Sequence, residues 1–167
     1  TFSDGKSPQY IMDYLNAVFG MMDDLIPTRG GFINKYLGDG FMAVFGAPLA
    51  NPDARHRAVE AGYELLRAVE RVNEAGEYPP TRIGIGLHAG EVVTGNIGTP
   101  QRREYTVIGE VVNIAARVEA LNKEFDSQFL ISSAVYEHVR DDVPNVKDLG
   151  GAIVKGSEAP IGIYQLA

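Results

Sequence analysis

Two aspartates are the residues of this chain best suited to chemistry on a phosphate group. Asp4 ends a strand-like stretch at the start of the chain, and Asp39 lies between two glycines in the segment NKYLGDGFMAVFG. If that strand and the hairpin around Asp39 are neighbours in a sheet, the two carboxylates meet at one edge. Paired carboxylates hold hard divalent cations, and two such ions can clamp both oxygens of a phosphoryl displacement. The alternative is that Asp39 is only a favourable turn residue beside glycine.

A second candidate pair lies in the segment VVNIAARVEAL. Asn113 and Arg117 are four residues apart, so they share one face of the predicted helix. An amide and a guanidinium at this spacing can together hold a sugar and a phosphate, and arginine suits the charge that develops on phosphorus. An exposed polar stripe on an amphipathic helix explains the same spacing.

Two lysines complete the set of candidate residues. Lys35 precedes the aspartate of the hairpin, and strict strand alternation places its side chain on the opposite face from Asn34 and Tyr36. Lys155, in the segment IVKGSEAP, is either a solvated loop lysine or a contact to a polyphosphate.

Composition narrows the class of protein. The chain has 167 residues, of which 45% are hydrophobic and 22% charged, and these values are typical of one globular domain. A net charge of −7 argues against a nucleic-acid partner. No apolar run is long enough for a membrane span. Because the chain has no cysteine and only three histidines, oxygen ligands and hence Mg²⁺, Mn²⁺ or Ca²⁺ are favoured for any metal site. We expect a single domain over residues 1–167, cut from a longer protein.

Hydrophobic periodicity and turn residues predict the elements that position these side chains. Ser7 and Asn51 are the expected caps of the first two helices. A hairpin turns at Gly38–Gly40, and a second hairpin turns at Ala89–Gly90. The predicted helices are 7–26, 51–76, 111–123 and 133–139, and the predicted strands are 31–37, 41–46, 81–88, 91–98, 104–109, 128–132, 146–150, 152–156 and 161–166.

The order of these elements predicts the fold class. Helices and strands alternate, yet short turns join neighbouring strands, so the sheet should be mixed or antiparallel with helices packed on it. This is an α/β (α+β) sandwich with a ferredoxin-like βαββαβ core.

Five segments taken together resemble the catalytic domain of the class III nucleotidyl cyclases, the adenylate and guanylate cyclases. They are FSD, NKYLGDGFMAVFGAP, GIGLHAGEVVTGNIG, REYTVIGEVVNIAARVEAL and VKGSEAPIGIYQL. They occur in the family's order and extend over essentially the whole chain. The combination of KYLGDG with YTVIGEVVNIAAR is the most specific part of this similarity.

The resemblance implies roles for the metal and the purine base. By motif, Asp4 and Asp39 correspond to the two aspartates that bind two Mg²⁺ ions, for which Mn²⁺ can substitute. Lys35 corresponds to the lysine that contacts the base, and its partner position is Thr106. Lysine with threonine or aspartate is similar to the adenylate cyclase pattern, whereas guanylate cyclases of this family usually carry glutamate at the lysine position.

The resemblance also implies roles for the sugar and phosphate contacts. Asn113 and Arg117 correspond to the residues that orient the ribose and stabilise the transition state, and Lys155 to the lysine that binds the triphosphate. Family members act as head-to-tail dimers in which each site takes its metal aspartates from one protomer and its remaining residues from the other. The implied protein is a cytoplasmic homodimer that converts ATP into 3′,5′-cyclic AMP and pyrophosphate.

Several other functions remain open at this stage. A guanylate cyclase of the same fold would use GTP, and a non-catalytic domain would bind nucleotide or dimerise without turnover. A diguanylate cyclase or polymerase domain shares the two-metal chemistry, but the former needs a different hairpin motif and the latter a basic channel. One departure from the family pattern is that Asp4 runs directly into GKSPQYIMDYL, without the isoleucine and Gly-Phe-Thr expected there. A genuine shortening, an engineered excision or a mobile active-site loop would each explain this departure, and we interpret it as a mobile loop.

Overall fold

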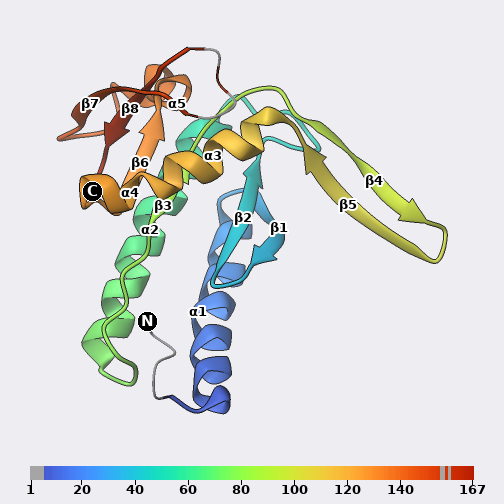
Figure 1. The fold of residues 1–167 in the computed structure, drawn as a ribbon, viewed down its shortest axis with the longest axis vertical. Helices are drawn as coiled ribbons and strands as arrows, with labels where there is room; N and C mark the ends of the chain where they lie inside the picture. Colours follow the sequence, from blue (N-terminus) through green and yellow to red (C-terminus); the bar gives the residue numbers. More distant parts are fainter. Residues whose placement is uncertain (1–5, 155–156, 158) are drawn as a thin grey trace.

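The computed structural model describes residues 6–154, 157 and 159–167 of the chain (Figure 1). Helices and strands alternate along it much as the sequence predicts. In chain order the elements are α1 (Pro8–Thr28), β1 (Gly31–Leu37), β2 (Gly40–Phe45), α2 (Ala54–Ala75), β3 (Ile85–Leu87), β4 (Val93–Thr99), β5 (Arg102–Ile108), α3 (Glu110–Ala120), α4 (Asn122–Phe125), β6 (Phe129–Ser132), α5 (Ser133–Val139), β7 (Lys147–Ala152) and β8 (Ile161–Gln165).

The strands form one mixed sheet and two antiparallel pairs. The sheet has the order β3-β6-β8-β7, with β3 parallel to β6 and with β8 antiparallel to both of its neighbours. The pairs are β1 with β2 and β4 with β5. The predicted class, mixed and antiparallel sheets with helices packed on them, is therefore confirmed. The predicted first strand, which ends at Asp4, lies outside the described residues.

The prediction of a hairpin at Ala89–Gly90 is wrong. β3 ends at Leu87 and pairs with β6 instead of with the strand that follows it. The chain then runs without regular structure to Val93, where β4 begins its pairing with β5. The Ala-Gly dipeptide indicates a change of direction, but not which strand becomes the partner.

The predicted strand at 152–156 is also wrong in its described part. Ile153 and Val154 lie outside any strand, and residues 155 and 156 lie outside the described residues. Ala152 instead ends β7, which pairs with β8 across a shift in register between Asp148 and Gly151. One irregular strand therefore replaces the two short strands that the sequence predicts.

The two long helices begin and end at recognisable signals. The Ser7 side chain accepts a hydrogen bond from the backbone N–H of Tyr10, which confirms the predicted cap of α1. The second predicted cap, Asn51, lies two residues before the observed N-cap of α2, which is Asp53. The Asn51 side chain instead accepts a hydrogen bond from the backbone N–H of Asp53. α2 ends at Gly76, whose φ of 70° is left-handed and favours glycine.

The helices bury an apolar stripe against the strands. α1 contributes residues spaced by four, which pack with α2 and with the inner face of β1 and β2. α2 also packs on β6, where a Cβ on Gly62 would lie 2.3 Å from the Phe129 ring. The stripe on α1 consists of Tyr14, Val18, Met22 and Ile26. Among the described residues, no helix has the length and apolar character needed to cross a bilayer.

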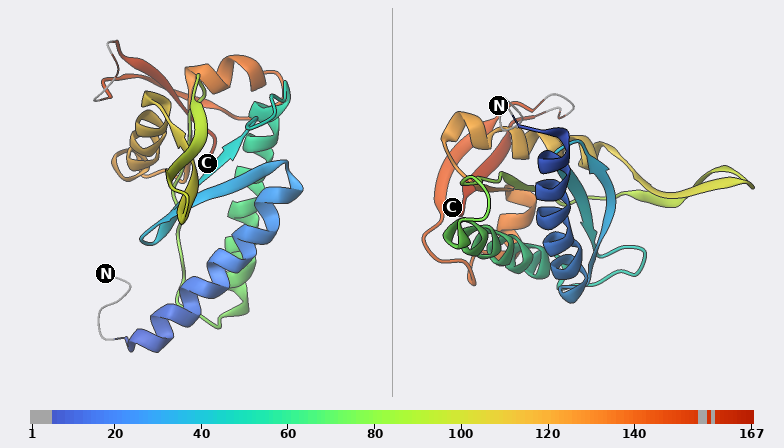
Figure 2. Two further views of the ribbon diagram at one scale, coloured as in Figure 1. Left: turned by 90° about the vertical axis from the view of Figure 1, so that its right-hand side faces the viewer. Right: turned by 90° about the horizontal axis from the view of Figure 1, so that it is seen from below.

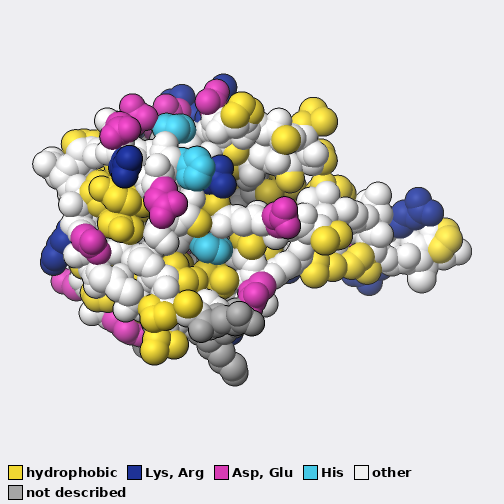
Figure 3. Space-filling view, turned by 90° about the horizontal axis from the view of Figure 1, so that it is seen from above, with side chains coloured by type: hydrophobic (Ala, Val, Ile, Leu, Met, Phe, Trp, Pro, Cys, Tyr) yellow, Lys and Arg dark blue, Asp and Glu magenta, His cyan; other side chains and the backbone are white. Residues whose placement is uncertain are grey.

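The β4–β5 pair projects away from the rest of the molecule as a two-stranded ribbon (Figures 1 and 2). One face of it carries Val93, Ile97 and Ile108, whose exposed fractions are 74%, 54% and 53%. Arg102 and Arg103 lie exposed at its tip. Figure 3 shows the apolar side chains along this arm and the basic group at its end. An exposed apolar face of this kind is typical of an interaction surface.

Candidate active site

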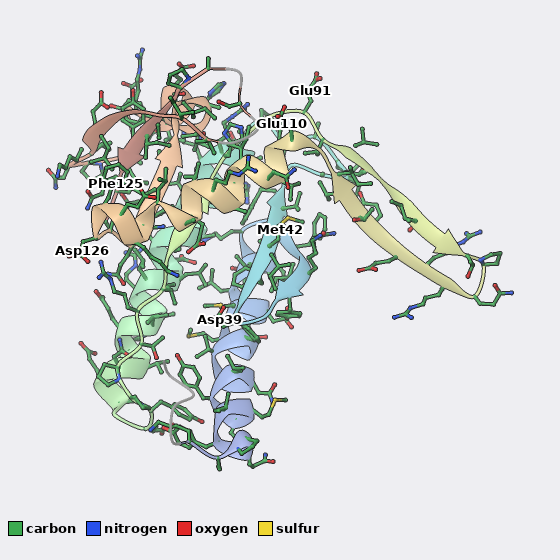
Figure 4. The ribbon with its side chains drawn as sticks, in the orientation of Figure 1. Asp39, Met42, Glu91, Glu110, Phe125 and Asp126 are labelled. Atoms are coloured by element: carbon green, nitrogen blue, oxygen red, sulfur yellow. The ribbon has the colours of Figure 1, made fainter. Side chains whose placement is uncertain are left out.

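Asp39 lies at the turn between β1 and β2, at the end of the hairpin (Figure 4). Gly38 precedes it with a φ of 65°, a left-handed conformation that glycine adopts without steric cost. The Asp39 side chain is exposed and forms no hydrogen bond or ion pair with other described residues. A free carboxylate between two glycines has room around it and is a hard oxygen ligand, so it fits a divalent cation.

A cavity of about 500 Å³ opens beside Asp39, between β2, β3, α2 and α3. Its charged lining residues are Asp39, Arg82, Glu119 and Lys123. Burial raises the pKa of the Glu119 carboxyl, the charge of Lys123 lowers it, and the charge of Asp39 raises it again. Asp39 and Glu119 are therefore close enough to interact within one copy of the chain.

The structure does not describe one of the two predicted metal ligands, so their distance from each other is not defined. Asp4 lies among residues 1–5, which the structure does not describe. Within the described ranges, no group of three or more histidine, aspartate or glutamate side chains could hold a metal ion. A metal site at Asp39 therefore stays a prediction that needs a second ligand.

Lys35 lies on the face of β1 that the alternation rule does not predict. The ladder pairs Ile33 with Ala43 and Lys35 with Met42, so Asn34 is an extra residue, a β-bulge. Opposed residues share a face, and Ile33 and Ala43 both pack toward α1. Lys35 therefore faces away from α1, on the same side as Asn34, so its predicted opposition to Asn34 is wrong. Its predicted opposition to Tyr36, whose ring packs against Phe19 of α1, is confirmed.

Thr106 belongs to the base of the ribbon. It lies opposite Gly95 in the β4–β5 ladder, and Val93 lies opposite Ile108. By alternation, Thr106 shares a face with these two exposed apolar residues and with Ile97. The predicted partner of Lys35 therefore faces the side of the ribbon on which apolar side chains are uncovered.

Asn113 and Arg117 lie one turn apart on α3, as the sequence predicts. Ile114 and Val118 are buried and anchor this helix to the sheet. Asn113 is exposed, whereas the Nη1 atom of Arg117 is buried and has no hydrogen-bond partner among the described residues. A buried guanidinium nitrogen without an acceptor is costly, and an anionic ligand would satisfy it.

The structure separates the candidate residues into two groups. β5 leads through Gly109 directly into α3, so Thr106, Asn113 and Arg117 lie on one continuous unit. Asp39 instead lines the cavity, together with Ala115 and Glu119 on the other side of α3 and with Lys123 of α4. Figure 4 shows Asp39 and Glu110, the first residue of α3, at opposite ends of the hairpin in that view. Lys155 lies outside the described residues.

Sequence reasoning missed the charged residues of the cavity. Glu119 and Lys123 are four residues apart and continue the spacing of Ala115, so a projection of the predicted helix 111–123 places all three on one side. Asn113 and Arg117 lie on the opposite side of this helix. Arg82, at the entrance to β3, gives no comparable signal in the sequence.

Comparisons with known proteins agree with this architecture. A family described as "Adenylate and Guanylate cyclase catalytic domain" matches residues 1–167. Adenylate cyclase 1 of Rhizobium meliloti (strain 1021) is 33% identical over 99% of this chain, which spans only 25% of that relative. The guanylyl cyclase Cya2 superposes with a TM-score of 0.86 at 35% identity, over 99% of this chain and 84% of that one. The adenylyl cyclase CyaB from P. aeruginosa superposes with a TM-score of 0.85 at 29% identity, over 99% and 86%.

Proposed function

The chain belongs to the family of adenylate and guanylate cyclase catalytic domains, and on that premise we propose that it converts ATP into 3′,5′-cyclic AMP and pyrophosphate. The observation that carries the proposal is the match of the family to the whole chain, within which the motif residues stand in order. We treat residues 1–167 as one catalytic domain of a longer protein. The activity requires divalent ions and two copies of the chain.

The proposed reaction is an internal displacement at phosphorus. The ribose 3′-oxygen forms a bond to the α-phosphorus, the bond from that phosphorus to the bridging oxygen breaks, and pyrophosphate leaves. The 3′-hydroxyl gives its proton to water or a nearby base. Arg117 donates hydrogen bonds to the phosphoryl oxygens as their charge grows. Its buried Nη1, which has no partner within the described part of the chain, supports this role. Asn113, one turn earlier on α3, orients the ribose.

The proposed metal ligands are Asp39 and, outside the described residues, Asp4. Bound Mg²⁺, for which Mn²⁺ can substitute, lowers the pKa of the 3′-hydroxyl and neutralises charge on the triphosphate. The Asp39 carboxylate is exposed and has no ion pair among the described residues, which supports its assignment. Lys155 is the proposed contact to the triphosphate.

In this proposal the residues that contact the base favour ATP over GTP. Lys35 carries a donor for the purine ring, and Thr106 is its partner. The adenylate cyclases among the relatives agree with this choice. Guanylate cyclase activity is the second candidate, because the guanylyl cyclase Cya2 is 35% identical to this chain over the aligned residues. A threonine hydroxyl both donates and accepts hydrogen bonds, so Thr106 discriminates less sharply than a carboxylate would.

A head-to-tail homodimer is part of the proposal. Within one copy, Asp39 faces the cavity while Asn113 and Arg117 lie on another face of α3, so one copy does not gather the full set. The exposed apolar face of the ribbon carries Thr106, and a second copy that covered this face would lie against the base site. The basic tip of the ribbon suits a body with a net negative charge. Two-fold symmetry then produces two equivalent sites.

Two further points complete the proposal. Because the substrate is a nucleoside triphosphate and the chain has no cysteine, we place the domain in the cytoplasm. A non-catalytic nucleotide-binding or dimerisation domain is the remaining alternative. The presence of Asn113, Arg117 and both aspartates in the sequence argues against it.

The decisive experiment measures products directly. The purified protein is incubated with ATP or GTP in the presence of Mg²⁺ or Mn²⁺, and cyclic nucleotide and pyrophosphate are quantified separately. We expect equal amounts of cyclic AMP and pyrophosphate from ATP, and slower turnover of GTP. Faster turnover of GTP would favour the guanylate cyclase alternative, and nucleotide binding without pyrophosphate release would favour the non-catalytic one.

A further inference from the structure

The β-bulge at Asn34 changes the direction in which Lys35 points. Before the bulge, Ile33 faces the core and Phe32 faces the ribbon. In a regular strand Lys35 would face the core with Ile33, because side chains alternate. The extra residue restores Lys35 to the outer face, opposite Met42. The bulge is therefore what makes this lysine available to a ligand.

The side chain of the bulge residue joins the hairpin to the ribbon. The Asn34 Nδ2 donates a hydrogen bond of 3.3 Å to the backbone carbonyl oxygen of Tyr105 in β5. Beside it, the rings of Phe32 and Tyr105 lie 5.9 Å apart. Among the described residues, no other hydrogen bond joins the β1–β2 hairpin to the ribbon. This hydrogen bond and this ring contact together link the hairpin to the ribbon. Of the two, only the hydrogen bond of the Asn34 amide depends on direction.

The link lies immediately beside the two residues that we assign to the base. Asn34 directly precedes Lys35, and Tyr105 directly precedes Thr106. The ribbon projects from the body, so small rotations at its base change the position of Thr106 relative to β1 (Figure 1). The hydrogen bond between Asn34 and the Tyr105 carbonyl opposes such rotations.

We infer that Asn34 is a positioning residue for base selection, which fixes Lys35 and Thr106 relative to each other. This inference rests on the proposed function. Asn34 does not touch the nucleotide in this account; it acts through the bulge and through the Tyr105 carbonyl. A carboxylate at this position cannot donate the bond and would face the carbonyl with like partial charge. A glutamine keeps the amide donor on a longer side chain.

The test compares three variants at this position with a matched control. Asn34→Ala removes the donor, Asn34→Asp replaces it with an acceptor of equal size, and Asn34→Gln retains it. The control is Asn96→Ala, an exposed asparagine that lies opposite Tyr105 in the ribbon ladder. For each protein kcat and KM are measured with ATP and with GTP, and the melting temperature verifies folding.

We expect the ratio of kcat/KM for ATP over GTP to fall by about threefold to tenfold in Asn34→Ala, the scale of one hydrogen bond. The change should be larger in Asn34→Asp, mostly in KM, and small in Asn34→Gln and Asn96→Ala. An unchanged ratio in folded Asn34→Ala and Asn34→Asp overturns the inference, as does an equal change in Asn96→Ala. A loss of kcat shared by both nucleotides would also overturn it, because that indicates a structural role only.

The same variants separate this inference from the proposed function. If the wild-type protein forms no cyclic nucleotide, the proposed function fails, and the ratio of affinities for fluorescent ATP and GTP analogues then decides the role of Asn34. A wild-type affinity ratio in Asn34→Asp overturns it, and a reduced ratio supports it. If Asn34→Ala does not fold, Asn34→Asp is compared with Asn34→Gln instead. A lower ATP-over-GTP ratio in Asn34→Asp than in Asn34→Gln supports the inference, and equal ratios overturn it.

Discussion

The body of the molecule and the β4–β5 ribbon hold their candidate residues by different means. In the body, α3 is anchored by the buried Ile114 and Val118, so Asn113 and Arg117 are fixed by packing within one copy. The ribbon instead leaves one face uncovered and meets β1 at its base through Asn34. The proposed sugar and phosphate contacts on α3 are thus held in place by packing within one copy, whereas the proposed base contact at Thr106 depends on a link and on a covering surface.

This difference predicts how each region responds to change. Body variants should alter turnover or folding by a factor, relative to the wild type, that does not change with protein concentration. Ribbon variants should alter assembly, and activity should then depend on concentration. The four predictions below test this division, beginning with the largest expected effect.

Arg117→Ala should damage turnover most. Loss of a donor to the developing charge lowers kcat by about 10²–10³-fold, while KM for ATP changes little. Steady-state kinetics with saturating Mg²⁺ measure both constants. The matched control is Arg140→Ala, an exposed arginine at the end of α5, which should retain full activity. Equal losses in kcat and in affinity would contradict the assigned role.

Ile97→Asp should weaken the dimer without unfolding the protein. A charge on the uncovered face of the ribbon removes an apolar contact, so we expect the dimer dissociation constant to rise by about tenfold to a hundredfold. Sedimentation at several concentrations measures it. Asn96→Asp adds the same charge to the opposite face and should have little effect. If Ile97→Asp leaves the dissociation constant unchanged, the apolar face is not the interface.

Gly62→Ala should destabilise the body. The added Cβ would lie 2.3 Å from the Phe129 ring, and such overpacking costs about 1–3 kcal/mol of unfolding free energy. Urea denaturation measures the loss. Gly20→Ala is the matched control on α1, where a Cβ has no neighbour within 4 Å, and it should gain up to about 1 kcal/mol. Equal gains in both variants would show that helix propensity, not close packing, governs these positions.

His88 should give the smallest effect, a modest loss of stability in mild acid. Burial lowers the pKa of its imidazole below the ordinary 6.5, and Nδ1 lies 2.8 Å from Ser132 Oγ. The unfolded chain binds a proton more readily, so this contribution is complete above about pH 6.5 and is lost as pH falls below it. Melting temperatures at about pH 7.5 and about pH 5.5 should differ less in His88→Asn than in the wild type. An equal pH dependence in both proteins would exclude His88 as the cause.

Much of the fold follows from local signals in the sequence. The cap at Ser7, the apolar spacing of α1 and the Gly38–Gly40 turn each specify a structure within a few residues, and all three are confirmed. Strand partners depend on distant residues. For that reason the predicted hairpin at Ala89–Gly90 is wrong: β3 pairs with β6, and β4 pairs with β5.

The candidate site could be predicted less completely. The motif positions came from the family resemblance, and the spacing of Asn113 and Arg117 on α3 is as expected. The bulge at Asn34 was missed, because one extra residue leaves the apolar–polar pattern of β1 almost unchanged. The contact of Asn34 with Tyr105 joins residues 71 positions apart, and no local pattern indicates it.

The central claim is that each active site takes its metal ligands from one copy and its transition-state arginine from the other. The most direct test mixes two inactive variants, Asp39→Ala and Arg117→Ala, and lets their subunits exchange before cyclic AMP is measured. Half of the random dimers are then mixed, and each has one intact site, so activity should recover to about a quarter of the wild-type value. A mixture no more active than its two components would contradict the shared site.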